Sequence, residues 1–467
     1  MRVAALVIAA VALAGCTVGP DYRRPAAPTP PDFRGAVAPP AAPSLGDLPW
    51  WQLFPDETLQ RLIREALAQN YDVRIAAARI LEARAQVTIA RSFQFPDVNA
   101  SANAPYERTE GTLAPPQLRE TFRPAGGLDF SYEVDLWGRF RRNSEAARAE
   151  LLGTEYGARF VVTTLVFDLG TAYLRLRALD EELRIARRTL DSRVGSLDLV
   201  RLRERGGVAG LIDVRQSEIL VADAAQTVPD IERQIEQTEN VISILLGRPP
   251  APVPRGRPLG EQIVATAVPA GLPGRLLEQR PDVRQAETQL AAATAHIGVA
   301  KADYFPRVFL TGAIGAGGLV VNGQTFGPQG LFAILPSMTL PIFNSGRVGA
   351  GVEAARARAE AALLVYQQTI LTALQDVSDA LVEHGKRREA RAQQEALTVA
   401  ARETTQLANV RYKGGVTPYL EVLDSERQLF DAELGLVRLQ RDELLAVVRL
   451  YKALGGGWQT APEHRNP

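Results

Sequence analysis

Residues Leu128 to Leu136 read Leu-Asp-Phe-Ser-Tyr-Glu-Val-Asp-Leu, so that apolar and polar side chains alternate at every position. Successive side chains of an extended strand point to opposite faces of a sheet. The alternation therefore predicts a β-strand with one apolar face and one face of acids and serine. An amphipathic strand packed on a soluble core has the same alternation, so this stretch alone leaves its surroundings open.

Three other stretches complete two hairpins. A first strand is predicted at about residues 98–106, and after a polar loop the second covers about 122–136. Glycine-rich candidates follow at about 307–319 and 330–342. Two hairpins with an apolar outer and a polar inner face are typical of outer-membrane barrels. A closed barrel needs about eight strands, so we expect the chain to pool its strands with other copies of itself.

The two hairpins belong to an internal repeat. Phe95-Pro96 recurs 210 positions later as Phe305-Pro306, and Glu145 to Ala149 recurs 208 positions later as Glu353 to Ala357. A repeat this long indicates two copies of one supersecondary unit. We assign repeat 1 to residues 56–265 and repeat 2 to residues 266–457. Each repeat is predicted to contain a helix, a β-hairpin and a long helical hairpin.

The helices are predicted from composition and periodicity. One helix opens each repeat, at about 56–93 and 281–304, and Pro96 and Pro306 follow their ends because proline cannot continue a helix. Helical hairpins are predicted at about 143–247 and 350–455. Leucine or valine recurs every seven residues from Val162 to Leu197, which is typical of coiled-coil packing. A buried helix of an ordinary bundle is the alternative. However, a helix of roughly 60 residues spans about 90 Å, which is longer than a compact domain of this size.

Both long helices end in a basic residue followed by Gly-Gly-Val. The glycines are Gly206 and Gly207 in repeat 1 and Gly414 and Gly415 in repeat 2. Glycine adopts the left-handed backbone conformation found at helix C-caps. We expect the chain to turn back here as a shorter helix, and the two turns to form the tip of a tube.

The N-terminus has the features of a bacterial lipoprotein signal. An apolar run from Val3 to Leu13 follows Met1-Arg2, and it is shorter than the roughly 20 residues that cross a bilayer. Leu13 to Cys16 resembles a lipobox, which predicts a signal peptide at residues 1–15 and a covalent lipid on Cys16. An ordinary signal peptide is the alternative. Residues 16–55 are predicted to be a lipidated, extended segment, and 458–467 a C-terminal tail.

Composition argues against several functional classes. The chain has 53 basic and 53 acidic residues, so it lacks the net positive charge of nucleic-acid-binding proteins. Its three histidines, His296, His384 and His464, are far apart, and Cys16 is the only cysteine. The sequence contains neither a phosphate-binding glycine loop nor a nucleophile elbow. We therefore predict no enzyme activity, no catalytic residue, no metal and no cofactor other than the lipid.

Several motifs resemble the outer membrane factor family of TolC-like efflux channels, in its lipoprotein branch. They are Gly19 to Tyr22 after the lipobox, Trp50-Trp51, Arg280 to Arg284, and the second Gly-Gly-Val turn followed by Leu420 to Asp424. The resemblance covers essentially the whole mature chain. It implies a mainly helical fold with a membrane β-barrel. A homotrimer would form a twelve-stranded barrel in the bacterial outer membrane, continued by a helical tunnel through the periplasm.

The resemblance also implies a mechanism of passive conduction. The partners would be a periplasmic adaptor (membrane fusion) protein, an inner-membrane resistance-nodulation-division pump and outer-membrane lipid, with no nucleic acid. Leu420, Glu421 and Asp424 match the constriction positions, and Asp213 is the counterpart of Glu421 in repeat 1. Threefold carboxylate rings would attract cations and raise their own pKa values through mutual repulsion.

Three alternatives remain open from the sequence. Glu421 and Asp424 are also compatible with a solvated helix face. The chain is also compatible with a type I secretion exit duct or with a structural periplasmic coiled-coil lipoprotein. An arginine latch beside the second turn is not expected, because Thr417-Pro418 stands where some relatives have arginine.

Overall fold

The computed structural model describes residues 17–27, 29–35, 44–108, 120–262, 271 and 273–458. The chain divides into two compact units. Unit 1 contains Met1–Ala26, Arg79–Glu155 and Gln285–Gln367, and unit 2 contains Ala27–Ala78, Tyr156–Arg284 and Gln368–Pro467. Four helices run from one unit into the other, namely α4 (Tyr71–Ser92), α5 (Arg139–Arg205), α8 (Pro281–Ala302) and α9 (Arg347–Lys413).

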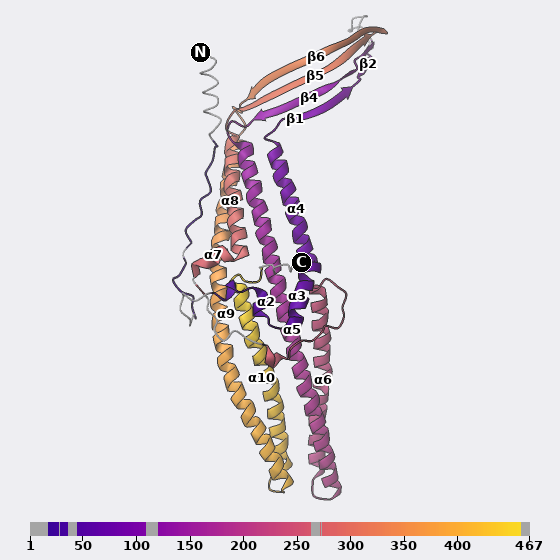
Figure 1. Ribbon diagram of the computed structural model, residues 1–467, viewed down its shortest axis with the longest axis vertical. Helices are drawn as coiled ribbons and strands as arrows, with labels where there is room; N and C mark the ends of the chain where they lie inside the picture. Colours follow the sequence, from indigo (N-terminus) through magenta and orange to yellow (C-terminus); the bar gives the residue numbers. More distant parts are fainter. Residues whose placement is uncertain are drawn as a thin grey trace, which may run out of the picture. The chain divides into compact units, whose positions relative to one another are not determined.

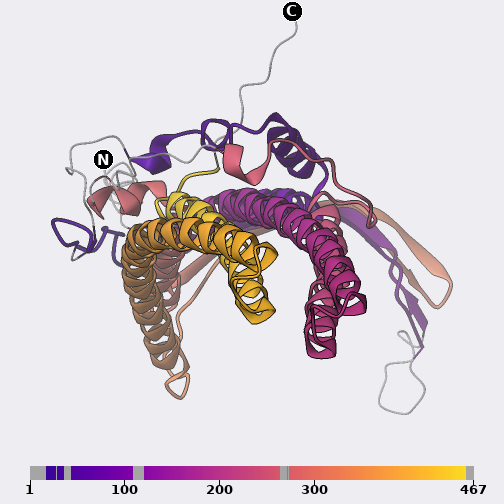
Figure 2. The same ribbon diagram turned by 90° about the horizontal axis from the view of Figure 1, so that it is seen from below.

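The duplication is visible in the helix lengths. α5 and α9 each have 67 residues, and α9 begins and ends 208 positions after α5. α6 (Leu211–Leu245) and α10 (Tyr419–Ala453) each have 35 residues at the same offset. α4 and α8 each have 22 residues, 210 positions apart. Figure 2 shows α5 beside α6 and α9 beside α10, the two helical hairpins.

Unit 1 contains one antiparallel sheet (Figure 1). β5 pairs with β6 on one side and with β3 and β4 on the other, while β1 pairs with β4 and β2 with β3. The strands are β1 (Asp97–Asn103), β2 (Tyr106–Arg108), β3 (Glu120–Phe122), β4 (Ala125–Val134), β5 (Arg307–Val321) and β6 (Gln324–Thr339). β1 and β6 therefore lie at opposite edges of the sheet.

The register aligns apolar side chains across three strands. Leu128 pairs with Ile314, and Ile314 pairs with Phe332, so the three share one face. Their exposed fractions are 50, 59 and 73%, respectively. Leu128 of β4 therefore belongs to an apolar row that is uncovered in the single chain, while Phe130, Tyr132 and Val134 of the same predicted face are half-buried. This contradicts packing on a soluble core.

Both hairpins differ in detail from the sequence-based prediction. The predicted strands at 98–106 and 122–136 are each interrupted, at Pro105 and at Pro124, because proline has no N–H for the ladder. The predicted loop between about 319 and 330 was wrong. β5 continues to Val321, and Asn322 (φ 48°) and Gly323 (φ 81°) turn the chain directly into β6. Two left-handed residues form the tight turn that joins twisted strands.

The first predicted helix, 56–93, is two helices. α3 (Glu57–Gln69) is followed by Asn70, which has an extended ψ of 135°, and α4 begins at the next residue. The Asn70 side-chain oxygen accepts hydrogen bonds from the N–H groups of Asp72 (2.8 Å) and Val73 (3.2 Å). Asparagine at this position caps the second helix, which explains the break.

The segment before α3 is more structured than predicted. Phe33, Leu45 and Trp50 are buried in unit 2, with exposed fractions of 5, 2 and 0%. The segment includes the 3₁₀ turn η1 (Leu45–Asp47) and the short helix α2 (Trp50–Leu53). Burial of these apolar side chains fixes a stretch that its proline and alanine content alone predicted to be extended.

The remaining short elements of unit 2 are η3 (Leu259–Glu261), η4 (Pro273–Arg275) and α7 (Leu276–Gln279). Within unit 2, three residues of the predicted heptad seam of α5 are buried, namely Leu169 and Leu176 at 0% exposure and Leu197 at 6%. Among the described residues, no helix combines the length and the apolar composition needed to cross a bilayer.

Candidate gate at the helical tips

The two predicted tip turns have the same backbone geometry, within unit 2. Gly207 and Gly415 both have a φ of 73°. The Val208 N–H donates to the Arg203 carbonyl and the Val416 N–H to the Arg411 carbonyl, both at 3.0 Å. This is the pattern of a glycine C-cap. The left-handed conformation belongs to the second glycine of each pair, and Gly206 and Gly414 remain outside it.

The return helices begin differently. Asp213 is the third residue of α6, and its Oδ2 accepts a hydrogen bond of 3.1 Å from the Gly210 N–H. The equivalent residues of α10 are Glu421 and Pro418. Proline has no N–H to donate, so Glu421 cannot make the bond that holds Asp213.

The other predicted constriction residues lie on the exposed side of α10. Leu420 is 60% exposed, and Glu421 and Asp424 are also exposed. The Asp424 carboxylate accepts hydrogen bonds from Arg427 Nη2 (2.8 Å) and Gln428 Nε2 (2.6 Å). No described residue forms an ion pair with Glu421. Of the predicted acids, Asp213 therefore caps a helix, Asp424 has a cation beside it, and Glu421 has neither.

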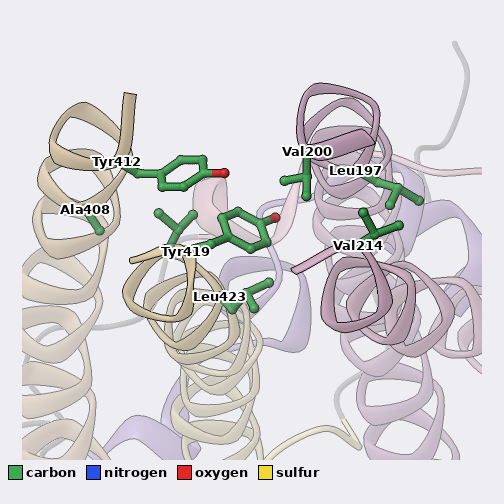
Figure 3. Packing of buried hydrophobic residues seen from close by; sticks show 8 residues of the cluster. Leu197, Val200, Val214, Ala408, Tyr412, Tyr419 and Leu423 are labelled. Atoms are coloured by element: carbon green, nitrogen blue, oxygen red, sulfur yellow. The ribbon is translucent and has the colours of Figure 1, made fainter. Parts of the chain in front are cut away.

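Near the tips, an apolar cluster joins the two hairpins (Figure 3). It contains Leu197 and Val200 of α5, Val214 of α6, Ala408 and Tyr412 of α9, and Tyr419, Val422 and Leu423 of α10. The rings of Tyr412 and Tyr419 have centroids 4.9 Å apart. Burial raises the pKa of Tyr419 to about 12, so its hydroxyl stays neutral. The Arg203 guanidinium lies 4.5 Å from the Tyr412 ring centroid, which adds a cation–π contact between the hairpins.

Further from the tips, charged groups cross the seam between the hairpins. Arg188 of α5 and Arg402 of α9 both bind the Glu433 carboxylate of α10, at 2.5 and 3.0 Å. Arg193 is 2% exposed, and its guanidinium lies 5.0 Å from the Phe430 ring centroid. A cavity of about 380 Å³ lies between these groups. The seam is therefore held by apolar packing at the tips and by ion pairs beyond them.

Within the same seam, Glu426 of α10 is a largely buried acid. Burial raises its pKa, while the nearby charge of Arg193 and a hydrogen bond from Ser196 oppose the shift. The Ser196 hydroxyl lies 3.5 Å from Glu426 Oε1. Burial therefore disfavours the charged form of Glu426 in this seam.

Comparison with known proteins identifies the architecture. The outer membrane efflux protein family matches residues 62–248 and 272–456 of the chain. The chain belongs to this family. Its sequence is 35% identical to the solvent efflux pump outer membrane protein SrpC of Pseudomonas putida, over 96% of this chain and 97% of that protein. It is 32% identical to the cation efflux system protein CusC of Escherichia coli, over 96% and 97%, respectively.

Solved channels of the family have the same fold. The outer-membrane channel OprN matches with a TM-score of 0.88 and 34% identity, over 95% of this chain and 100% of that one. The open state of the MtrE outer membrane channel of Neisseria gonorrhoeae matches with a TM-score of 0.85 and 32% identity, over 95% and 99%. The predicted fold class, the function as an outer-membrane channel of an efflux system and the outer-membrane location are confirmed. These matches favour neither a secretion duct nor a structural lipoprotein.

In this outer membrane efflux protein, sequence reasoning missed the residues that join the hairpins. Tyr412, Tyr419 and Glu433 were not predicted as contacts. The buried positions of α10 between 419 and 433 recur at helical spacing, on the side opposite Leu420 and Glu421. That periodicity was the available signal, but it does not tell which helix is the partner.

The predicted lipidation site, Cys16, lies outside the described residues of this efflux protein, but the segment just after it is fixed in unit 1. The Val18 N–H donates to the Trp137 carbonyl at 3.0 Å. Arg142, 4% exposed, binds the Asp21 carboxylate at 2.6 Å. A side-chain Cβ at Gly19 would lie 2.4 Å from the Gly298 Cα, so the strap formed by residues 17–24 packs directly on α8.

Proposed function

We propose that this protein is the gated exit duct of a tripartite efflux system. A periplasmic adaptor protein and an inner-membrane resistance-nodulation-division pump would deliver substrate, and the duct would conduct it passively to the exterior. The observation that carries the proposal is the uncovered apolar face formed by Leu128, Ile314 and Phe332 on a sheet with two edges. Such a face fits lipid, and its edges need partners there.

The proposed assembly is a homotrimer. Backbone N–H and C=O groups of β1 and β6 at the sheet edges would remain unpaired in a bilayer, at a cost of several kcal/mol each. Pairing β1 of one copy with β6 of the next satisfies both edges. β1 with β2, and β3 with β4, each count as one interrupted strand, so each copy supplies four strands with β5 and β6. Three copies then give twelve strands, the number implied by the family resemblance and within the range of outer-membrane barrels.

The proposed gate is at the tips of the helical hairpins. Glu421 would form the principal carboxylate ring, with Leu420 narrowing the passage beside it. Asp424 would contribute less negative charge than its position suggests, because Arg427 lies 2.8 Å away. Asp213 would act mainly as a helix cap. The four predicted positions thus have different roles in the proposed gate.

The proposed membrane attachment includes a lipid on Cys16. The strap places Thr17 against Gly138, within 3.1 Å of a Cβ built there, and Gly138 lies just after the end of β4 at Val134. A lipid on the preceding residue would therefore enter the bilayer beside the strands. The intact mass of the mature protein tests this, because an unmodified mature N-terminus would overturn the assignment.

The proposed substrates are those that the pump supplies. SrpC is named for solvents and CusC for cations, and their identities to this chain, 35 and 32%, are similar. The duct sequence thus does not favour either class, and we propose no cofactor, enzyme activity or metal-specific role for it.

Conductance in planar lipid bilayers tests the proposal. We expect the wild-type protein to insert and remain mostly closed. Glu421→Ala with Asp424→Ala should open the channel, because the proposed closed tip would lose the polar contacts of both carboxylates. Glu403→Ala, an exposed acid on α9, is the matched control. Insertion with wild-type closure in the double variant would remove the gate assignment, and the absence of any conductance would contradict the duct itself.

A further inference from the structure

The duplication provides an internal comparison at the start of each return helix. Gly210 and Pro418 occupy the same position, the residue before α6 and α10, respectively. Their backbone angles are close, with φ and ψ of −86° and 155° for Gly210 and −68° and 155° for Pro418. The two turns therefore differ in hydrogen-bonding chemistry more than in conformation.

In the first turn, Asp213 forms hydrogen bonds with the backbone of Gly210. The Gly210 N–H donates to Asp213 Oδ2 at 3.1 Å, and the Asp213 N–H donates to the Gly210 carbonyl at 3.0 Å. A carboxylate in this reciprocal arrangement is stabilised by the backbone donor and by the positive end of the helix dipole. Its charge is partly neutralised, and its position is fixed.

The second turn cannot do the same. Pro418 offers no N–H to Glu421. The Glu421 carboxylate is exposed, and within the described part of the chain it has no cationic partner. Glutamate is also one methylene longer than Asp213. Its charge can therefore extend away from the helix start.

We infer that Pro418 is a positioning residue for the gate, because it withholds the N–H that would otherwise hold Glu421 against the start of α10. This inference rests on the proposed gate at the tips. It assigns the two hairpins unequal roles. Hairpin 1 uses its acid to cap a helix, and hairpin 2 presents its acid to permeating ions.

Ion selectivity of the single channel tests the inference. Pro418→Ala restores the N–H at a turn position where alanine accepts the same φ and ψ. A capping hydrogen bond favours the capped state by about fivefold, so we expect the potassium-to-chloride permeability ratio to fall by about two- to fivefold. The reversal potential under a KCl gradient measures this ratio. Gly210→Pro is the matched variant, since it removes the donor from Asp213, and we expect it to raise the ratio.

A Glu421→Gln background separates an effect on the position of the Glu421 charge from a general change in the shape of the turn. In Glu421→Gln, adding Pro418→Ala should have no further effect on the ratio, because no charge remains to be moved. Equal ratios for Pro418→Ala and wild type, in channels where Glu421→Gln lowers the ratio, would overturn the inference and leave the duct intact. A conducting channel in which Glu421→Gln changes nothing would overturn both the inference and the gate assignment. Protein that never conducts would contradict the proposed function.

Discussion

Replacement of Arg280 by alanine should destabilise unit 2 more than the loss of any surface ion pair. Arg280 is 7% exposed. Its Nη2 binds Asp282 at 2.6 Å and Asp376 of α9 at 3.0 Å, and its Nη1 donates to the Ala453 carbonyl at the end of α10 at 3.1 Å. One guanidinium therefore connects the start of α8, the middle of α9 and the end of α10.

The expected loss of stability depends on the carboxylates that remain without their partner after Arg280→Ala. Removal of one partner of a buried ion pair costs about 3–5 kcal/mol, because a charge is left without compensation. The Asp282 and Asp376 side chains are 23 and 45% exposed, so water can recover part of the loss. We therefore expect the lower end, about 3 kcal/mol, which lowers the melting temperature by roughly 5 °C for a unit of this size.

The first repeat offers a matched control. Asn70 is the counterpart of Arg280, and its Nδ2 donates to the Leu245 carbonyl at 2.9 Å, just as Arg280 binds the end of α10. Arg280→Asn should keep the carbonyl contact, lose the ion pairs and melt between wild type and Arg280→Ala. Arg275→Ala removes an exposed pair and should cost less than about 1 kcal/mol.

Thermal melting of the detergent-solubilised protein, monitored by circular dichroism, gives the melting temperatures of wild type and the three variants. Equal melting temperatures for Arg280→Ala and Arg275→Ala would refute the reasoning. An Arg280→Asn variant as unstable as Arg280→Ala would show that the carbonyl contact contributes nothing.

Three further changes test other parts of the structure. Burial alone would raise the pKa of Asp56, but hydrogen bonds from Gln262, Arg257 and Tyr173 lower it overall. The stabilisation of the folded protein by ionised Asp56 is therefore present above about pH 4 and lost as the pH falls through the depressed pKa. Asp56→Asn should lower the free energy of unfolding by about 2 kcal/mol at pH 7. It should also flatten the acid side of a plot of melting temperature against pH. In Gly298→Ala the new Cβ would lie 2.6 Å from the Val18 carbonyl, so limited proteolysis should release the strap faster than in wild type, whereas Gly351→Ala, with no atom within 4 Å, should not. Burial raises the pKa of Glu426, so protonation at lower pH removes a charge that burial disfavours. Glu426→Gln should therefore melt no lower than wild type at pH 7. The wild-type melting temperature should approach that of the variant as the pH falls.

Much of the fold could be predicted because its signals are local and duplicated. The alternation from Leu128 and the 208-residue offset indicate strands and helical hairpins without knowledge of any distant contact. The turn at Asn322-Gly323 was also predictable, since Asn-Gly is a strong hairpin signal. The glycines around it led instead to the prediction of a long loop. Pro105 and Pro124 were likewise available as signals of interrupted strands.

The candidate gate was less predictable because its contacts are not local. Spacing alone makes Asp213 and Glu421 equivalent, and only the hydrogen bond to Gly210 distinguishes them. Tyr412 and Tyr419 lie on either side of the second Gly-Gly-Val turn in the sequence, but their packing against Val200 requires the two hairpins to be side by side. Sequence periodicity identifies a buried face without identifying its partner helix.

The duplicated architecture limits where the two halves can differ. The paired helices have equal lengths, and the tip glycines Gly207 and Gly415 have equal φ values. Differences in function between the two halves must therefore come from side chains and not from the backbone. The differences occur in single side chains at equivalent positions, such as Asn70 and Arg280, or Gly210 and Pro418. Each exchange keeps the local backbone and changes the hydrogen-bond donors. It follows that swapping one residue between equivalent positions changes the chemistry while leaving the scaffold in place, which makes such swaps more informative about this duct than alanine substitutions.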